Sequence, residues 1–151
     1  MNFLRGGNTS PKTSGSVVIL RVKNVVYFAV GGLAYVVLEL CWRRRSHVSM
    51  FLLGGLCFLI LCALGRSKHT FVWQTFLGAG AVTALELGAG LLLNRVLRLG
   101  VWDYSGRPCQ FLGQICLCYS LLWIPVCAGG LLFARSLRRI LGEQPDPIRW
   151  L

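Results

Sequence analysis

The sequence from residue 71 to residue 93 reads FVWQTFLGAGAVTALELGAGLLL, and Glu86 is its only charged side chain. A helix of about 20 apolar residues is long enough to cross the hydrocarbon core of a bilayer. Similar apolar runs occupy residues 24–42, 48–65 and 111–134. These runs lack the alternation of polar and apolar residues that a transmembrane β-barrel strand requires. The pattern predicts an all-α integral membrane bundle of about four transmembrane helices.

The composition supports a lipid environment. Hydrophobic residues make up 55% of the chain and charged residues 14%, whereas soluble domains carry about 25% charged residues. The net charge is +11, and the basic residues lie between the apolar runs instead of on a separate polar domain. This distribution favours contact with phospholipid headgroups over contact with nucleic acid. We therefore expect the lipid bilayer as a partner and no nucleic acid.

Short polar links separate the apolar runs. Residues 43–47 join the first two runs and residues 66–70 join the next two. Links this short predict that sequential helices are antiparallel neighbours, arranged as two hairpins. The expected organisation is a flexible basic N-terminal tail over residues 1–23, a transmembrane domain over residues 24–134 and a basic C-terminal tail over residues 135–151.

The distribution of basic residues also predicts an orientation. With four spans, both termini and the link 66–70 lie on one side of the membrane, and that side carries more Lys and Arg residues than the other. The positive-inside rule places that side in the cytoplasm. The run Arg43-Arg44-Arg45 lies on the opposite side and argues against this orientation. The overall count of basic residues nevertheless favours cytoplasmic termini.

Two carboxylates, Glu39 and Glu86, fall within the predicted spans, where a charged side chain is costly and often functional. Glu39 precedes Arg43 by four residues, so an interfacial ion pair and a functional role are both open. Glu86 has no basic residue within a helical turn and shares a helix face with Thr83. Its carboxyl group either faces a polar cavity or is protonated and hydrogen-bonded to another span. Gln114 starts the fourth run and is interpreted as solvated at the interface or as part of a polar pathway.

The sequence lacks the common motifs of enzymes and metal sites. No GxxxxGK[ST], HExxH or GxSxG pattern is present, and neither is a Ser/His/Asp arrangement. The seven cysteines lie mostly in apolar runs, and we interpret them as small buried hydrophobic residues with free thiols. We therefore predict no enzymatic activity, no catalytic residues, no metal and no cofactor.

Several segments resemble one family of bacterial membrane proteins. The most specific block is Val101-Trp102-Asp103-Tyr104-Ser105, followed by Pro108, Gly113-Gln114-Ile115-Cys116-Leu117 and Trp123. Further matching segments are Gly31 to Tyr35 with Glu39, Ser49 to Gly55 with Phe58, and Thr83 with Glu86, Gly90 and Asn94. Over residues 24–125 the chain resembles the CmpB-like family called "putative ABC transporter type IV". One departure is Gln110, where the family usually has Asn.

The resemblance implies a permease-like transport subunit in the inner membrane of a bacterium. An ABC permease requires a separate ATPase subunit and usually more than four spans, so the resemblance also implies a homo-oligomer or other membrane subunits. Under this hypothesis Glu86, Thr83, Glu39 and Gln114 are candidates for a polar pathway.

The segment Trp102, Asp103, Tyr104 and Ser105 is a candidate interfacial motif at the mouth of the pathway, with Asp103 as a capping residue more than a catalytic one. The alternative function is a non-transporting accessory or sensor protein whose buried carboxylates only specify helix packing.

Overall fold

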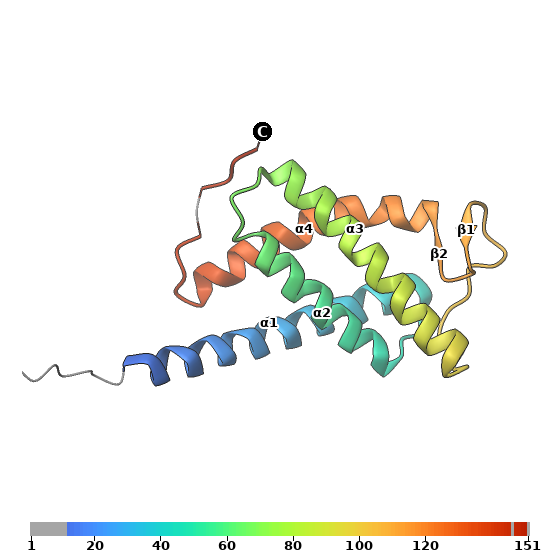
Figure 1. Cartoon of the computed structure of the whole chain (residues 1–151), viewed down its shortest axis with the longest axis horizontal. Coiled ribbons are helices and arrows are strands. Elements are labelled where there is room, and N and C mark those ends of the chain that lie inside the picture. Colours follow the sequence, from blue (N-terminus) through green and yellow to red (C-terminus); the bar gives the residue numbers. More distant parts are fainter. Residues whose placement is uncertain (1–11, 146, 151) are drawn as a thin grey trace, which may run out of the picture.

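The computed structural model describes residues 12–145 and 147–150, and most of them are helical (Figure 1). The elements are the helices α1 (Lys12–Arg43), α2 (Val48–Leu64), α3 (Phe71–Gly90) and α4 (Leu117–Ile140), the π-helix η1 (Leu91–Val96), and the strands β1 (Gln110–Phe111) and β2 (Ile115–Cys116). The strands pair with each other in an antiparallel hairpin. The all-α prediction is therefore confirmed, with the hairpin as a small addition.

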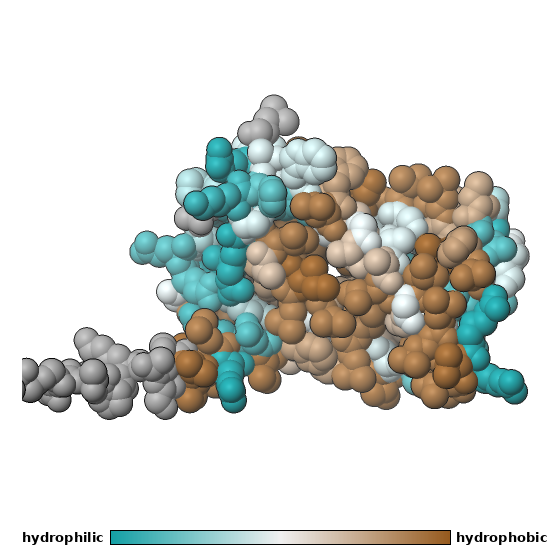
Figure 2. All heavy atoms as spheres, viewed as in Figure 1, coloured by the Kyte–Doolittle hydropathy of each residue, from teal (hydrophilic) through white to brown (hydrophobic). Residues whose placement is uncertain are grey.

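Among the residues that the structure describes, three helical segments are long and apolar enough to cross a membrane: Val17–Arg43, Phe71–Val96 and Leu117–Ile140. Helix α2 is more apolar than these segments and contains no charged residue, but it has 17 residues, which corresponds to a length of about 25 Å. Large apolar side chains such as Leu33, Trp73 and Leu121 are more than half exposed on the sides of the bundle. Figure 2 shows the apolar surface between two polar ends. This is the surface of a membrane protein, with lipid in contact with its sides.

The four α-helices of the described part of the chain form two antiparallel hairpins, α1 with α2 and α3 with α4 (Figure 1). The first turn of α1, the link 65–70 and the last turn of α4 lie at one end of the bundle. The link 44–47, η1 and the β-hairpin lie at the other end, which we call the hairpin end. The predicted pairing of sequential helices is confirmed.

The first hairpin is closely packed because glycines on each helix face aromatic residues on the other. A Cβ atom added to Gly32 would lie 2.6 Å from the carbonyl oxygen of Phe51. One added to Gly54 would lie 2.7 Å from Cγ of Tyr35. The remaining pairs are Gly31 with Phe58 and Gly55 with Phe28. Small residues of this kind allow two helices in a membrane to approach closely.

Several element boundaries differ from those expected from the sequence. Helix α1 already includes residues 12–23, because the apolar residues 17–20 extend the first run toward the N-terminus; residues 1–11 lie outside the described residues. Helix α4 begins at Leu117 instead of residue 111, because Leu112 and Gly113 adopt positive φ values of 54° and 70° that turn the chain into the β-hairpin. At its other end, α4 continues past residue 134 to Ile140.

A single carboxylate connects three parts of the bundle at the end opposite the hairpin. Glu143 accepts hydrogen bonds from Nε of Arg138 at 2.9 Å and from the hydroxyl of Tyr27 at 3.0 Å. It also pairs with Lys23 and Arg66, each at 3.4 Å. Burial alone raises the pKa of Glu143, but the bonds from Arg138 and Tyr27, the charge of Arg66 and the bond from Lys23 outweigh this effect and lower the pKa to about 2.

This lowered pKa predicts a pH-dependent stability. The stabilisation is fully present above the unfolded-state pKa of 4.5 and is lost as the pH falls toward about 2. At pH 7 we expect Glu143→Gln to lower the free energy of unfolding by about 1–3 kcal/mol, and the difference from the native chain to disappear near pH 2. Unfolding in detergent at several pH values measures the effect. The matched control is Arg139→Gln, because Arg139 is exposed. A difference in the free energy of unfolding between Glu143→Gln and the native chain that does not change with pH would contradict the prediction.

Candidate functional site

Glu86 lies on α3 toward the hairpin end of the bundle and is only 4% exposed. One carboxylate oxygen accepts a hydrogen bond from the hydroxyl of Tyr104 at 3.0 Å, and the other accepts from Nε1 of Trp123 at 2.9 Å. Both donors are neutral, and none of the ion pairs in residues 12–145 and 147–150 involves Glu86. The carboxylate therefore connects α3 to α4 and to the segment after η1 without a direct cationic partner.

Glu39, in the last turns of α1, is the second buried carboxylate of the site. It accepts a hydrogen bond from the hydroxyl of Ser46 at 2.7 Å and pairs with Arg43 at 3.5 Å. A second nitrogen of Arg43 donates to the carbonyl of Val101 at 3.4 Å. The i,i+4 ion pair that the spacing suggested is thus present, and Arg43 also connects α1 to the segment that follows η1.

Both carboxylates line one cavity of about 260 Å³ at the hairpin end, and Arg43 is its third charged residue. Its aromatic walls are Tyr35 and Trp42 of α1, Tyr104, and Tyr119 and Trp123 of α4. Tyr35 and Trp123 are stacked with ring centroids 5.9 Å apart, and Tyr104 and Tyr119 with centroids 4.9 Å apart. We call this space the carboxylate cavity.

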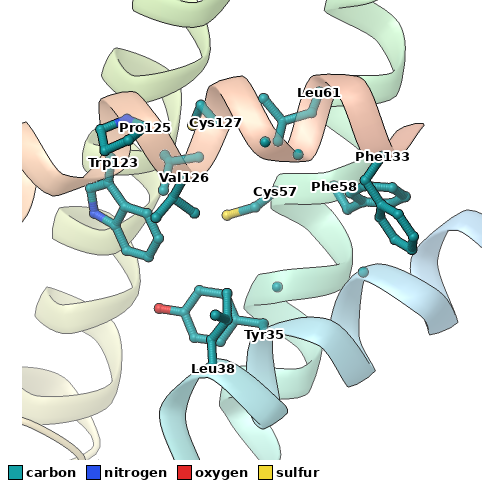
Figure 3. Close-up of a pocket in the computed structure, with 15 residues that line it drawn as sticks. Tyr35, Leu38, Cys57, Phe58, Leu61, Trp123, Pro125, Val126, Cys127 and Phe133 are labelled. Carbon is teal, nitrogen blue, oxygen red and sulfur yellow. The ribbon is translucent and has the colours of Figure 1, made fainter. Parts of the chain in front are cut away.

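A second cavity of about 290 Å³ adjoins the first and is almost entirely apolar. Four residues line both cavities: Tyr35, Leu38, Trp123 and Val126. Figure 3 shows Cys57 of α2 between Tyr35 of α1 and the residues of α4, with Leu61 and Phe133 farther along the bundle. The apolar cavity therefore continues from the carboxylate cavity toward the opposite end of the molecule.

The segment between η1 and α4 is held in place by a second polar network. Asn94 donates to the side-chain oxygen of Gln114 at 2.8 Å and to the carbonyl of Trp102 at 2.9 Å, and it accepts from the amide of Val101 at 2.7 Å. The indole of Trp102, only 4% exposed, donates to the carbonyl of Gln114 at 2.9 Å. Gln114 is thus placed in this network and not on the wall of the carboxylate cavity. Thr83 is half-buried and does not line that cavity either.

The remaining residues of the candidate interfacial motif form a turn. Asp103 is exposed and accepts hydrogen bonds from the hydroxyl of Ser105 at 2.5 Å and from its amide at 2.8 Å. These two bonds, the hydroxyl first, lower the pKa of Asp103 below its usual range. The turn directs Tyr104 toward Glu86. Burial, followed by the charge of Glu86 and the hydrogen bond to it, raises the pKa of Tyr104, so its hydroxyl stays protonated and remains a donor.

Several residues of the cavity were not identified from the sequence as site residues. Tyr35 and Trp123 were named only as residues that resemble the family, and Trp42 and Tyr119 were not singled out. A signal was available, because Tyr35, Glu39 and Trp42 follow one face of a helix at spacings of four and three residues, and Tyr119 and Trp123 are four apart. Within the described ranges, no three His, Cys, Asp or Glu side chains converge as metal ligands would. The arrangement offers buried carboxylates and aromatic faces, which suit a cation or a proton.

The comparisons with known proteins are consistent with a membrane function. A family model described as putative ABC-transporter type IV matches residues 25–147, which is most of the chain. No curated protein and no solved structure matches. The matched region includes all the residues that line the two cavities.

Proposed function

Because the chain belongs to the putative ABC-transporter type IV family, we propose that it is a membrane subunit of a transport system and that Glu86 and Glu39 lie on the solute's route. The observation that carries this proposal is the carboxylate cavity. A carboxylate that served only to connect helices would be enclosed by its partners, whereas Glu86 lines a cavity of about 260 Å³ together with Glu39. Ionisable groups within membrane spans commonly mark such routes.

The adjoining apolar cavity supports the same function. The two spaces share part of their walls and extend along the bundle from the hairpin end. Together they are too small for a complete passage, so the proposal includes a second copy of the chain or other membrane subunits, and a separate ATPase subunit. We further propose a bacterial inner membrane with both termini in the cytoplasm, which places the carboxylate cavity toward the outer face.

One observation favours a second candidate function, a non-transporting accessory or sensor protein. Both oxygens of Glu86 already accept hydrogen bonds, from Tyr104 and Trp123, and these bonds join three segments of the fold. Such a carboxylate can specify helix packing without binding a solute. The two functions differ in whether the cavity is reached from both sides of the membrane.

Access to the cavity can be measured with thiol labelling, because a transport route must open to each side in turn. Val126, which lines both cavities, is replaced by Cys in a chain whose reactive or cavity-lining cysteines have been changed to Ala. Those cysteines are Cys41, Cys57, Cys109, Cys118 and Cys127. A membrane-impermeant cationic thiol reagent is applied to right-side-out and to inside-out vesicles.

We expect Val126→Cys to be labelled in vesicles of both orientations. The control is Leu121→Cys on the same helix, whose side chain is 55% exposed on the surface of the bundle and lines neither cavity, and which we expect to remain unlabelled. Labelling of Val126→Cys from one side alone would overturn the transport proposal and favour the accessory function.

A further inference from the structure

The charges of the carboxylate cavity select for a cation. Glu39 and Glu86 contribute two carboxylates, and Arg43 contributes the single guanidinium. Arg43 forms its ion pair with Glu39. The hydrogen-bond donors to Glu86 are instead the neutral side chains of Tyr104 and Trp123. A cationic ligand would place a positive charge beside Glu86, which has no direct cationic partner. An anionic ligand would be repelled by the two carboxylates. The site therefore favours a positively charged ligand.

The aromatic walls make this preference more specific. Five aromatic rings line the cavity, and they come from α1, from the segment after η1 and from α4. Nε1 of Trp42 donates a hydrogen bond to the hydroxyl of Tyr119 at 3.5 Å, so two of these aromatic walls are in contact. Aromatic faces attract organic cations such as quaternary ammonium groups, whose hydration is weak. A small inorganic ion would instead require several oxygen ligands in close contact.

The apolar cavity defines the rest of the ligand. It begins at the residues shared with the carboxylate cavity and is lined beyond them by side chains such as Cys57, Leu61 and Phe133 (Figure 3). A ligand whose cationic group lies beside Glu86 would place any attached alkyl chain in this space. Burial of such a chain makes the free energy of binding more favourable in proportion to its length, so each methylene multiplies the affinity.

We propose that the carboxylate cavity and the apolar cavity together form a binding site for an ammonium cation that carries an apolar tail. This inference rests on the proposed function, since it names the class of solute that the route would carry. The carboxylates Glu86 and Glu39 and the five aromatic residues hold the ammonium group, and the apolar cavity holds the tail.

Binding to the full chain in lipid nanodiscs tests the charge requirement first. Choline is compared with 3,3-dimethylbutan-1-ol, which has the same shape without the charge, by equilibrium dialysis against empty nanodiscs. We expect choline to bind at least tenfold more tightly. Glu86→Gln is expected to remove this preference, and Trp42→Leu, at a largely exposed position, to weaken choline binding about threefold to tenfold. Equal binding of choline and the neutral alcohol to the native chain would overturn the proposal.

The tail is tested with tetramethylammonium, butyltrimethylammonium and hexyltrimethylammonium. After correction for partition into empty nanodiscs, each added methylene is expected to increase affinity about threefold to fourfold. Gly129 is an exposed residue that lines the apolar cavity, and a Cβ added there meets no atom within 4 Å, so we expect the side chain of Gly129→Leu to reduce the space left for a tail. This variant should weaken the dependence on chain length and leave tetramethylammonium binding unchanged. Gly80→Leu, which lies outside both cavities, is the control. No dependence on chain length in the native chain would overturn the proposal.

The outcome separates this inference from the proposed function. Charge-selective binding combined with labelling of Val126→Cys from one side alone would leave the ligand class in place and refute transport. Labelling from both sides without charge-selective binding would refute the ligand class and leave transport in place.

Discussion

Leucine in place of Glu86 is expected to lower the free energy of unfolding by about 2–6 kcal/mol. The substitution leaves the hydroxyl of Tyr104 and Nε1 of Trp123 without their acceptor. Each buried donor that loses its partner costs roughly 1–3 kcal/mol. Unfolding of the purified variant in mixed micelles measures the effect. A Glu86→Leu chain as stable as the native one would contradict the hydrogen-bonding role of this carboxylate.

Glutamine at the same position separates the structural contribution from the charge. Glu86→Gln keeps one acceptor oxygen, so we expect about half the loss of stability caused by leucine. Both variants should abolish choline uptake by cells that supply the other subunits of the system if Glu86 lies on the route of the solute. Uptake that survives in Glu86→Gln, together with a loss of assembly in Glu86→Leu, would instead assign a packing role to Glu86.

Leucine at Gly54 is the second substitution for which we expect a large effect. The added Cβ would lie 2.7 Å from Cγ of Tyr35, and the rest of the side chain would have to fit between α1 and α2. Inserting a side chain into closely packed helices typically costs about 1–3 kcal/mol, and more when backbones must separate. Because α1 and α2 must move apart here, we expect a loss of about 3 kcal/mol or more, measured by unfolding in detergent and by folded yield.

Gly80→Leu provides the matched control for Gly54→Leu. Gly80 lies on α3, is exposed, and an added Cβ meets no atom within 4 Å. The change in side chain is the same, but leucine also increases helix propensity by several tenths of a kcal/mol. We therefore expect Gly80→Leu to be as stable as the native chain or more so. Equal losses in Gly54→Leu and Gly80→Leu would show that packing of the first hairpin is not the cause.

The helices were predictable because the length and apolar character of a segment decide whether it crosses a bilayer. The backbone must satisfy its own hydrogen bonds there, so an apolar run of sufficient length becomes a helix. Because the links at residues 43–47 and 66–70 are short, sequential helices are expected to pack side by side in antiparallel directions. The exact ends of α1 and α4 were not predictable, because they depend on residues 12–23 and on a β-hairpin whose turn requires positive φ at Leu112 and Gly113.

The hydrogen-bond partners of the candidate site residues could not be predicted from the sequence. Glu86 was identified because a carboxylate in an apolar run is conspicuous, but its donors lie 18 and 37 residues away in the chain. Which donors reach it depends on how α3 and α4 are rotated about their axes, and apolar residues lie on all sides of α3, so the sequence does not specify the rotation of this helix. For the same reason the sequence could not place Gln114 beside Asn94, 20 residues earlier.

The glycine contacts of the first hairpin have a consequence for biosynthesis. All the residues that form them lie between Phe28 and Phe58, so this interface is complete before α3 leaves the ribosome. Contacts between residues so close in the sequence form rapidly, and N-terminal units generally assemble first during translation. The nascent α1–α2 pair can therefore enter the bilayer as a finished unit, onto which α3 and α4 assemble as they are synthesised.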